Sequence, residues 1–476
     1  MLSQRSKLSW HKRMSFCNSG VRQIVVLAGG KGTRLASFTG GLPKPLVPVK
    51  GMAVLERILR QAEEAHFEEA LVLLGYQADQ IERALQTGSY KIALRLVCES
   101  KPLGTAGAVL SAFELLREHF LVVYADVLMD VDLMSFCNFH AAKAADATLF
   151  CHPNDHPGDS DLVDVDKSGR IRRFFSHPHP ENLATRNLGN AALYCIRRSS
   201  LAAWRVHDAP LDFAKGLFPS MLERGARMYG YLSREYIKDM GTPERLSCVE
   251  KDLESGLVAG SRLDRSMPAV FFDRDGVVNV ERGHIASEDD VELYAGVAEA
   301  LKLLKSAGYL CVVVTNQPVV ARGECSMETL RRIHGRIDML LGRSGAYFDA
   351  WYVCPHHPDR GFPGEVPVLK VTCNCRKPAT GMLEQCRKDL NIDLKSSWLI
   401  GDQTRDIQMA ENAGLSSILV TTGFAGTDRK YEAKPLYIAE DCLHAALLIC
   451  SKDRALPQRT TSLRSSSRLK ATAMAL

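Results

Sequence analysis

The chain has 476 residues, which is too long for one ordinary hydrophobic core, so we expect at least two domains. Its apolar content of 46% and charged content of 24% are typical of globular proteins, and no apolar run is long enough to insert into a membrane. The formal net charge of +5 lies at the ends: residues 1–20 contribute +4 and residues 452–476 contribute +5, which leaves −4 for the remainder. This distribution argues against a basic groove for nucleic acid.

The two ends and the cysteines indicate the compartment. Residues 1–20 are polar and lack the apolar segment of a secretory signal, so we expect a cytoplasmic protein. Residues 1–20 and 451–476 are predicted to be disordered, since they are polar, basic and without periodicity. The 14 cysteines of a chain without an export signal are expected to be reduced.

The first predicted strand, 21–27, leads into a glycine-rich loop, AGGKGTR at 28–34. Glycines directly after a strand let backbone N–H groups approach an anion, and Lys31 and Arg34 add positive charge to the loop. The pattern is neither a Walker loop nor a dinucleotide fingerprint. Taken alone it predicts either a tight turn or a phosphate site.

Helical and strand patterns then alternate along the N-terminal half. Helical periodicity at 54–65, 78–85 and 106–116 is interleaved with apolar strand patterns at 70–74 and 120–126. Such alternation predicts a mostly parallel sheet covered by helices.

Five motifs of this half, LAGGKGTRL, PKPLVPV, PLGTAGA, YADV and KDMGTPE, resemble those of the sugar-1-phosphate nucleotidyltransferases over about residues 22–250. The resemblance implies that a sugar phosphate oxygen attacks the α-phosphorus of a nucleoside triphosphate and that pyrophosphate leaves. It implies that Lys44 neutralises the α-phosphoryl group, that Asp126 and Asp239 hold magnesium, and that Gly104 and Thr105 line the nucleoside and sugar pocket. The residues implied to hold the triphosphate are Gly29, Gly30, Lys31, Gly32 and Arg34.

Two positions depart from the family pattern. Ala125 stands where a glycine is usual, and His177 stands where a lysine usually contacts the sugar phosphate. A histidine is only partly charged at neutral pH, so Arg172, Arg173 and Arg186 remain open as the acceptor-phosphate contact. An alternative of a different class is that this half is a catalytically inactive sensor of sugar nucleotides, although the retained lysine and carboxylates argue against it.

The sequence divides into a nucleotidyltransferase domain at 21–256, a linker at 257–268 and a second domain at 269–450. The second domain opens with a short buried strand that ends in Asp273-Arg-Asp275-Gly. Because residues i and i+2 of a strand point the same way, both carboxylates should meet at its carboxyl end, where open α/β sheets bind ligands. Adjacent carboxylates repel unless a cation relieves them, which favours a magnesium-dependent phosphate site over a solvated turn.

Three later segments support the phosphate site. A predicted strand at 309–317 ends in Thr315 and Asn316, another ends at Asp402, and Arg376-Lys377-Pro378 lies between them. The motifs DRDGVVN, VVVTNQ, RKP and GDQTRD resemble the haloacid-dehalogenase (HAD) phosphatases over about residues 268–425.

The HAD resemblance implies a role for each residue. Asp273 attacks phosphorus and forms an aspartyl phosphate, while Asp275 protonates the leaving sugar alkoxide and then activates water. General-acid help of this kind is worth roughly two to four orders of magnitude. Magnesium is held by the Asp273 carboxylate, the Asp275 backbone carbonyl and Asp402, and Asp406 supports the metal shell. The phosphoryl oxygens are bound by Thr315, Asn316 and Lys377.

A cysteine cluster lies in the loop before Lys377. Cys354 and His356, followed by Cys373 and Cys375, offer four soft ligands at zinc spacing, and four protein ligands imply a closed structural site. This loop, followed directly by Arg376, resembles the D-glycero-D-manno-heptose 1,7-bisphosphate 7-phosphatases. Histidinol phosphatases share the loop and remain the main competitor. The resemblance implies that Arg376 shapes the substrate pocket and that no large cap covers it.

Together the halves predict an α/β protein with two doubly wound domains: a Rossmann-like mixed sheet, and a HAD-like domain with a zinc loop and no large cap. A phosphatase that yields heptose 1-phosphate supplies the acceptor of a nucleotidyltransferase, so we expect a bifunctional enzyme that activates heptose for surface polysaccharide. Its resemblance favours GTP as the triphosphate. A histidinol phosphatase joined to a hexose-1-phosphate nucleotidyltransferase is the alternative, although nothing links those two substrates chemically.

Overall fold

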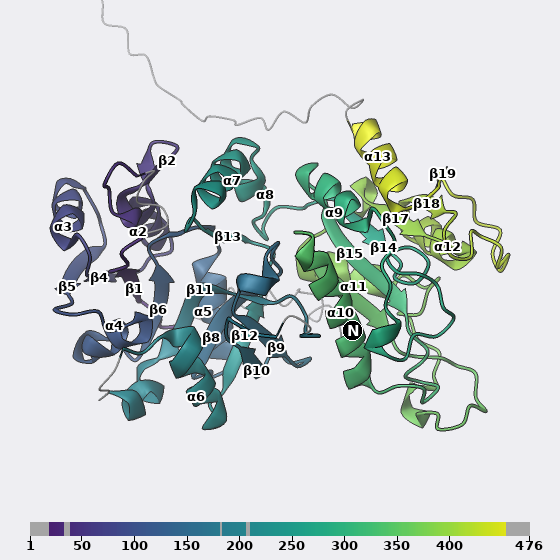
Figure 1. Ribbon diagram of the computed structural model, residues 1–476, viewed down its shortest axis with the longest axis horizontal. Coiled ribbons are helices and arrows are strands. Elements are labelled where there is room, and N and C mark those ends of the chain that lie inside the picture. The colour runs from purple at the N-terminus through teal and green to yellow at the C-terminus, as the bar shows by residue number, and fades with distance from the viewer. Residues whose placement is uncertain (1–18, 33–38, 181–182, 206–209, 454–476) are drawn as a thin grey trace, which may run out of the picture.

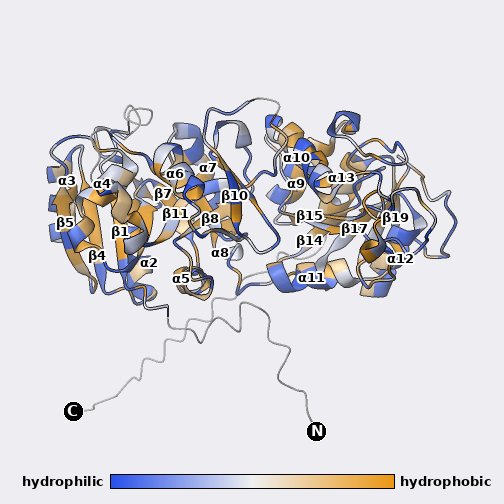
Figure 2. Cartoon of the chain, turned by 90° about the horizontal axis from the view of Figure 1, so that it is seen from below, coloured by the Kyte–Doolittle hydropathy of each residue, from blue (hydrophilic) through white to orange (hydrophobic). Residues whose placement is uncertain are grey.

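The computed structural model describes residues 19–32, 39–180, 183–205 and 210–453, which form two α/β lobes (Figure 1). Each lobe contains one large β-sheet with helices packed on it, so the prediction of two α/β domains is confirmed. Most of the two ends that were predicted to be disordered, residues 1–18 and 454–476, lie outside the described residues, as does Arg34. The central strands of both lobes are mainly apolar, and polar residues gather on loops and outer helix faces (Figure 2).

The N-terminal sheet is mixed. Its central strand β1 has β6 on one side and β4 on the other, all parallel, whereas β11 runs antiparallel to β6. This is the Rossmann-like mixed sheet that was predicted. Among the described residues its nine strands are β1 (Gln23–Ala28), β4 (Glu69–Leu74), β5 (Ala93–Cys98), β6 (His119–Tyr124), β8 (Ala147–His152), β9 (Leu162–Val165), β10 (Ile171–Phe175), β11 (Gly189–Arg197) and β12 (Met228–Leu232).

Two short strand pairs and a set of helices complete this lobe. Alternate residues of β1 face opposite cores, with Ile24 and Val26 in one and Val25 in the other, because helices cover both faces of the sheet. The short pairs are β2 (Pro48–Val49) with β3 (Met52–Ala53), and β7 (Val127–Asp130) with β13 (Tyr236–Asp239). The α-helices are α2 (Val54–Glu64), α3 (Ala78–Thr87), α4 (Thr105–Ser111), α5 (Leu133–Ala142), α6 (Phe218–Glu223) and α7 (Pro243–Glu254). Short 3₁₀ segments are η1 (Lys44–Leu46), η2 (Phe113–Leu115), η3 (Pro157–Asp159) and η4 (Arg198–Trp204), and η5 (Phe213–Leu217) is a short π-helix.

The C-terminal sheet is parallel throughout, in the order β16-β15-β14-β17-β18-β19. Strand β14 is central and fully buried: Val270 and Phe272 face one core, and Ala269 and Phe271 face the other. The strands are β14 (Ala269–Phe272), β15 (Leu310–Asn316), β16 (Ala350–Cys354), β17 (Trp398–Gly401), β18 (Ser416–Val420) and β19 (Tyr437–Ala439).

Helices cover both faces of this sheet as well. The core that contains Phe272 is closed by α9, α10 and α13, and the core that contains Phe271 is closed by α11 and α12. The helices are α9 (Val297–Ser306), α10 (Met327–Arg343), α11 (Gly381–Leu390), α12 (Thr404–Ala413) and α13 (Cys442–Asp453), with turns η6 (Glu288–Asp290), η7 (Pro367–Leu369) and η8 (Leu394–Ser396). The doubly wound HAD-like fold is therefore confirmed.

The segment that joins the lobes is fastened by Arg234. Its guanidinium donates to the backbone carbonyls of Ser261, Arg262 and Leu390, each at 2.9 Å. The predicted linker 257–268 includes a short helix, α8 (Leu257–Gly260). Through Arg234 it is bonded to both lobes. Its bounds, like those of the two domains, stay predictions.

Helix α10 brings the lobes into close contact through glycine. A Cβ added at Gly335 would lie 2.7 Å from the backbone of Thr185, and one at Gly342 would overlap the ring of Pro157. Because these glycines lie seven residues apart, they share one helix face. That face packs directly on the backbone of the N-terminal lobe.

Candidate active sites and metal centre

The carboxyl ends of β14, β15 and β17 lie side by side, because these strands are parallel neighbours. Asp273 follows β14, and Asp402 follows β17, with Asp406 in the first turn of α12. One carboxylate oxygen from each of these three residues lies within 4.8 Å of the others, and all three are buried. The structure thus brings Asp273 and Asp402 together, as the sequence predicted.

Lys377 lies within this cluster. Its Nζ is 2.7 Å from Asp273 Oδ2 and 2.7 Å from Asp406 Oδ1, and the residue is only 4% exposed. Burial raises the pKa of Asp402 to about 9 and that of Asp273 to about 6, with the neighbouring carboxylates adding to the effect and Lys377 opposing it. Burial alone would lower the pKa of Lys377, but the two carboxylates outweigh it and the net pKa is raised.

The three carboxylates fit a hard divalent cation. Asp402 Oδ1 is buried and has no hydrogen-bond partner among the described residues, and one lysine does not balance three carboxylates. Oxygen-only donors are those that Mg²⁺ prefers. Gly276 has φ +78°, and a Cβ there would overlap the Asp402 carboxylate, so the chain makes room for this group.

Asp275 points to a different set of partners. Arg274 donates from Nε to Oδ1 and from Nη2 to Oδ2, each at 2.9 Å, while Asn279 and Gln317 donate at 3.0 and 2.8 Å. Burial would raise the pKa of Asp275, but Arg274 and these hydrogen bonds outweigh it and lower the net pKa. Without substrate, this carboxyl is therefore held as the carboxylate.

The other predicted phosphate ligands differ in what they contact. Thr315 is buried and accepts from Gln317 Nε2 at 3.0 Å. Asn316 is bonded to the Lys377 backbone, accepting from its N–H at 3.0 Å and donating to its carbonyl at 3.3 Å, so it positions the lysine loop. Arg376 donates to the carbonyl of His356 at 3.1 Å. The sequence argument missed Gln317, although it directly follows the Thr-Asn pair.

The four predicted zinc ligands converge. Cys354 Sγ lies 3.6 Å from Cys373 Sγ and 3.7 Å from His356 Nδ1, while Cys375 Sγ lies 3.2 Å from Cys373 Sγ and 3.3 Å from His356 Nδ1. No disulfide joins these cysteines. In a tetrahedron with Zn–S bonds of about 2.3 Å the ligand atoms are separated by about 3.8 Å. The donor set and spacing fit zinc.

In the N-terminal lobe the glycine loop borders a cavity of about 570 Å³. Lys44 Nζ lies 3.1 Å from Asp126 Oδ2 at one end of it. Gly32 has φ +62°, and a Cβ there would lie 2.7 Å from Lys44 Cγ, so glycine lets the lysine cross the loop. Predicted residues that line this cavity are Gly29, Gly30, Lys31, Lys44, Gly104, Thr105 and Asp126.

Thr105 and a carboxylate that was not predicted also line this cavity. The Thr105 hydroxyl donates to Asp212 at 2.7 Å and accepts from the Phe213 backbone N–H at 3.0 Å. These bonds also hold α4 against the start of η5. Glu99 lines the cavity without having been predicted, and burial raises its pKa. No sequence pattern marked this glutamate, since it follows a strand without a recognisable motif.

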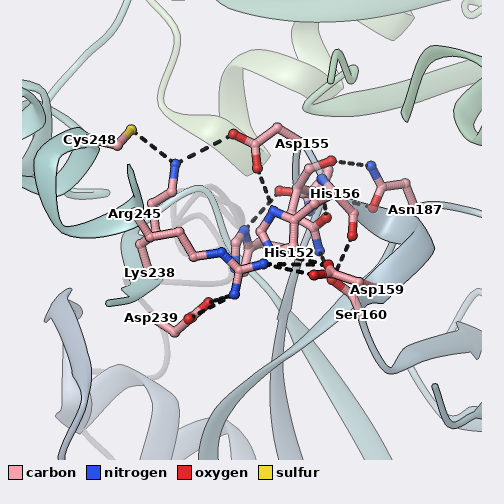
Figure 3. Close-up of polar contacts among 12 residues, drawn as sticks. His152, Asp155, His156, Asp159, Ser160, Asn187, Lys238, Asp239, Arg245 and Cys248 are labelled. Atoms are coloured by element: carbon pink, nitrogen blue, oxygen red, sulfur yellow. Dashed lines mark hydrogen bonds and ion pairs between the residues drawn. The ribbon is translucent and has the colours of Figure 1, made fainter. Parts of the chain in front are cut away.

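Asp239 lies apart from this cavity. Strand pairing places it next to Val127, yet its carboxylate oxygens accept from Arg245 at 2.9 and 3.0 Å, and Arg245 reaches Asp159 at 3.1 Å (Figure 3). It lines a second cavity of about 600 Å³ between the lobes. Burial would raise the pKa of Asp239, but Arg245 lowers the net value. The structure does not direct its carboxylate at the Lys44–Asp126 pair.

The residues considered for the acceptor phosphate are also engaged elsewhere. His177 is half-buried, and its Nδ1 lies 3.3 Å from the Gly158 carbonyl. Arg172 pairs with Asp166, Arg173 with Asp164 and Glu328, and Arg186 with Asp338. None of these four residues lines the cavity that holds Lys44.

Comparison with known families agrees with this geometry. A family model described as nucleotidyl transferase matches residues 23–256, and one described as HAD-hydrolase-like matches residues 374–445. The protein is thus an enzyme that joins a nucleotidyltransferase domain to a HAD-like phosphatase domain.

Curated relatives identify the C-terminal half more closely. A D-glycero-beta-D-manno-heptose-1,7-bisphosphate 7-phosphatase of Yersinia pestis is 41% identical over 162 residues, which cover 34% of this chain and 84% of the relative. A D-glycero-D-manno-heptose-1,7-bisphosphate 7-phosphatase of Thermosynechococcus vestitus is 42% identical over 191 residues, which cover 39% and 96%. Through this half, the chain belongs to the heptose-1,7-bisphosphate 7-phosphatase family.

A solved phosphatase structure is also similar to part of this chain. The D,D-heptose 1.7-bisphosphate phosphatase of B. bronchiseptica, complexed with magnesium and phosphate, is 31% identical and covers 39% of this chain and 99% of its own, with a TM-score of 0.34.

As for membranes, none of the helices in the described ranges combines the length and hydrophobicity of a bilayer-spanning segment.

Proposed function

We propose that this enzyme removes the 7-phosphate of D-glycero-D-manno-heptose 1,7-bisphosphate and then transfers GMP from GTP to the resulting heptose 1-phosphate. The observation that carries the proposal is the buried cluster of Asp273, Asp402 and Asp406 around Lys377. The names of the relatives support the bisphosphate as substrate. The product would be an activated heptose for surface polysaccharide such as lipopolysaccharide, made in the cytoplasm.

In the first reaction, Asp273 attacks phosphorus and the bond to the C7 oxygen breaks. Asp275 gives its proton to the departing alkoxide, which leaves heptose 1-phosphate and an aspartyl phosphate. Water then attacks this phosphorus, Asp275 takes the proton of the water, and inorganic phosphate leaves. Because Arg274 holds Asp275 as a carboxylate before substrate binds, the negative phosphate must raise the pKa of Asp275 on entering.

The cations of this site come from the chain and from a metal. Lys377 is close enough to Asp273 to stabilise the phosphoryl oxygens during attack. We assign magnesium to the carboxylates of Asp273 and Asp402 and to the backbone carbonyl of Asp275, where it would supply charge neutralisation. The unpartnered Asp402 Oδ1 supports this assignment.

We assign a structural zinc ion to Cys354, His356, Cys373 and Cys375. Four protein ligands complete a tetrahedron and leave no position for substrate. Because Arg376 donates to the His356 carbonyl, the zinc loop also fixes the residue before Lys377. Zinc would thus order one wall of the phosphatase site.

In the second reaction, an oxygen of heptose 1-phosphate attacks the α-phosphorus of GTP, and pyrophosphate leaves. Lys44 lies where it can neutralise the α-phosphoryl group, and Asp126 beside it can hold magnesium. Asp239 can join Asp126 as a magnesium ligand only if its carboxylate leaves Arg245. That geometry also keeps the inactive-sensor alternative open.

Product analysis of the full chain tests the proposal. The purified protein is incubated with each anomer of the bisphosphate and with each of the four nucleoside triphosphates. We expect phosphate release from one anomer, followed by pyrophosphate release with GTP. Asp273→Asn should lose the first reaction and keep the second on added heptose 1-phosphate, and Asp126→Ala should do the reverse. Pyrophosphate release with none of the triphosphates would favour the sensor, and hydrolysis of histidinol phosphate alone would favour the other phosphatase.

A further inference from the structure

An arginine of the nucleotidyltransferase domain enters the phosphatase domain. Arg186 Nε donates to Asp338 Oδ2 at 2.7 Å, and the backbone N–H of Asn187 lies 3.3 Å from the same oxygen. Asp338 belongs to α10 and is 2% exposed. A buried carboxylate of one domain is therefore neutralised by the other domain.

The second oxygen of Asp338 continues the contact inward. Trp351 of β16 donates its Nε1 to Asp338 Oδ1 at 3.0 Å. The indole ring stacks on His334, with ring centroids 4.6 Å apart and planes inclined by 22°. The Arg186 guanidinium lies 5.6 Å from the indole centroid as well. Arg186 thus constrains Trp351 in two ways: it holds Asp338, the hydrogen-bond acceptor of the indole N–H, and it lies close to the indole ring.

His334 contacts the arginine that holds Asp275. Its Nε2 lies 3.3 Å from Nη1 of Arg274, which is fully buried. Burial, with Arg274 and Arg186 adding to it, lowers the pKa of His334 well below its usual value, so the neutral ring can accept a hydrogen bond from the guanidinium. Arg274 in turn donates hydrogen bonds to both carboxylate oxygens of Asp275.

These contacts form one continuous path between the domains. A bidentate guanidinium fixes the plane of its carboxylate, and the direction of Asp275 decides whether its proton reaches the leaving oxygen. We propose that Arg186 is a positioning residue for the phosphatase reaction, acting through Asp338, Trp351 and His334 on Arg274 and thereby on Asp275. This inference depends on the proposed role of Asp275 as the proton donor.

The path makes a selective prediction about leaving groups. A sugar alkoxide needs a proton in order to depart, whereas p-nitrophenolate departs without one. A misdirected Asp275 should therefore slow a sugar phosphate and spare p-nitrophenyl phosphate. The quantity to compare is kcat/KM, because it covers only the steps up to departure of the leaving group. General loss of structure would lower both values together.

The experiment measures kcat/KM of the full chain with heptose bisphosphate and with p-nitrophenyl phosphate. Complete loss of a general acid costs roughly 10²–10⁴-fold. Since Arg186→Ala leaves Arg274 in place, we expect about a tenfold loss on the sugar phosphate, less than about twofold on the aryl phosphate, and partial recovery in Arg186→Lys. Asp338→Asn, which keeps an acceptor for Trp351, should show the same selectivity if Arg186→Ala fails to fold.

Two further variants separate the possible results. Glu328→Gln removes the exposed interdomain ion pair at the start of α10, in which Arg173 lies 3.0 Å from Glu328, and it should change neither value. Equal losses on both substrates in Arg186→Ala, no loss on either, or a selective loss in Glu328→Gln would each overturn the inference. Asp275→Asn supplies the reference: an unselective loss there would refute the proton-donor role, and the inference with it.

Discussion

Replacing Lys377 with methionine keeps the length of the side chain but removes the ammonium group that lies 2.7 Å from both Asp273 and Asp406. The three buried carboxylates, with Asp402 as the third, then face one another without this counter-charge. In the metal-free protein they must take up protons or remain charged in a region from which water is excluded. We therefore expect Lys377→Met to destabilise the phosphatase domain.

The size of the effect follows from the burial of the pair. Removing one partner of a buried ion pair typically costs about 3–5 kcal/mol. For a domain of this size each kcal/mol lowers Tm by about 2–4 °C, so the expected loss is about 6–20 °C. Magnesium should reduce the difference in Tm between variant and parent, because the cation should bind more tightly to carboxylates that have lost the lysine charge. Each tenfold lower Kd adds about 1.4 kcal/mol to the stabilisation by a saturating ligand that binds only the native state.

The assay is calorimetry of the full chain, following the transition of the phosphatase domain in EDTA and in excess Mg²⁺. Lys388→Met serves as the control, because Lys388 is an exposed residue of α11. If Lys377→Met melted within about 2 °C of the parent protein in EDTA, the buried charge balance would be wrong. A gap that widened on adding Mg²⁺ would contradict the assignment of the cation to these carboxylates.

Three other changes test separate parts of the site. Cys373→Ser should lower the bound zinc, measured by atomic emission, and lower Tm with it, because structural zinc contributes folding free energy; unchanged Tm at zero zinc would contradict a structural role. Gly276→Ala should lower phosphatase turnover, since φ is +78° and the new Cβ would overlap Asp402; parental kcat would show that the backbone relaxes. In EDTA, the free energy of unfolding should fall as the pH rises from 6 to 9. The folded pKa of Asp402, about 9, exceeds its unfolded value of about 3.9, so the native state binds more protons than the unfolded state. A Tm that rises with pH over this range would refute the prediction.

Much of the phosphatase site could be predicted from sequence, because a parallel sheet brings the carboxyl ends of its strands to one edge. Once strand ends carry Asp273, Thr315 and Asp402, a parallel sheet places them at one edge, whatever the intervening chain does. The zinc ligands could also be predicted, because they form two short sequence pairs at the ends of one loop.

Side-chain partners could not be predicted in this way. The resemblance implied that Asp239 holds magnesium together with Asp126, and strand pairing places it next to Val127, yet its carboxylate bonds to Arg245. Asn316 likewise ends the expected strand but holds the Lys377 backbone. Such choices depend on which neighbours three-dimensional packing supplies, and these neighbours are distant in sequence.

The contact between the domains was equally hidden. Gly335 and Gly342 look like weak points in a helix, where glycine costs about 1 kcal/mol relative to alanine. The structure shows that they admit the backbone of Thr185 and the ring of Pro157. The glycines of the phosphatase domain are explained only by the nucleotidyltransferase domain that packs on them, so their role appears once both domains are placed.

The placement of the two sites predicts how the intermediate travels. The transferase residues Lys44 and Asp126 line a cavity within the N-terminal lobe. The cavity between the lobes does not join it to the phosphatase site, because it reaches Leu310, the first residue of β15, whereas the phosphatase residues follow the carboxyl ends of the same sheet. Strand β15 has seven residues, so about 20 Å of sheet separates that cavity from the catalytic carboxylates. Heptose 1-phosphate should therefore leave through solvent. An equimolar mixture of Asp273→Asn and Asp126→Ala chains should then form nucleotide sugar as fast as the parent protein at equal concentrations of each active site. A mixture that is many times slower, at concentrations where the parent protein is fast, would show direct transfer within one chain and contradict this geometry.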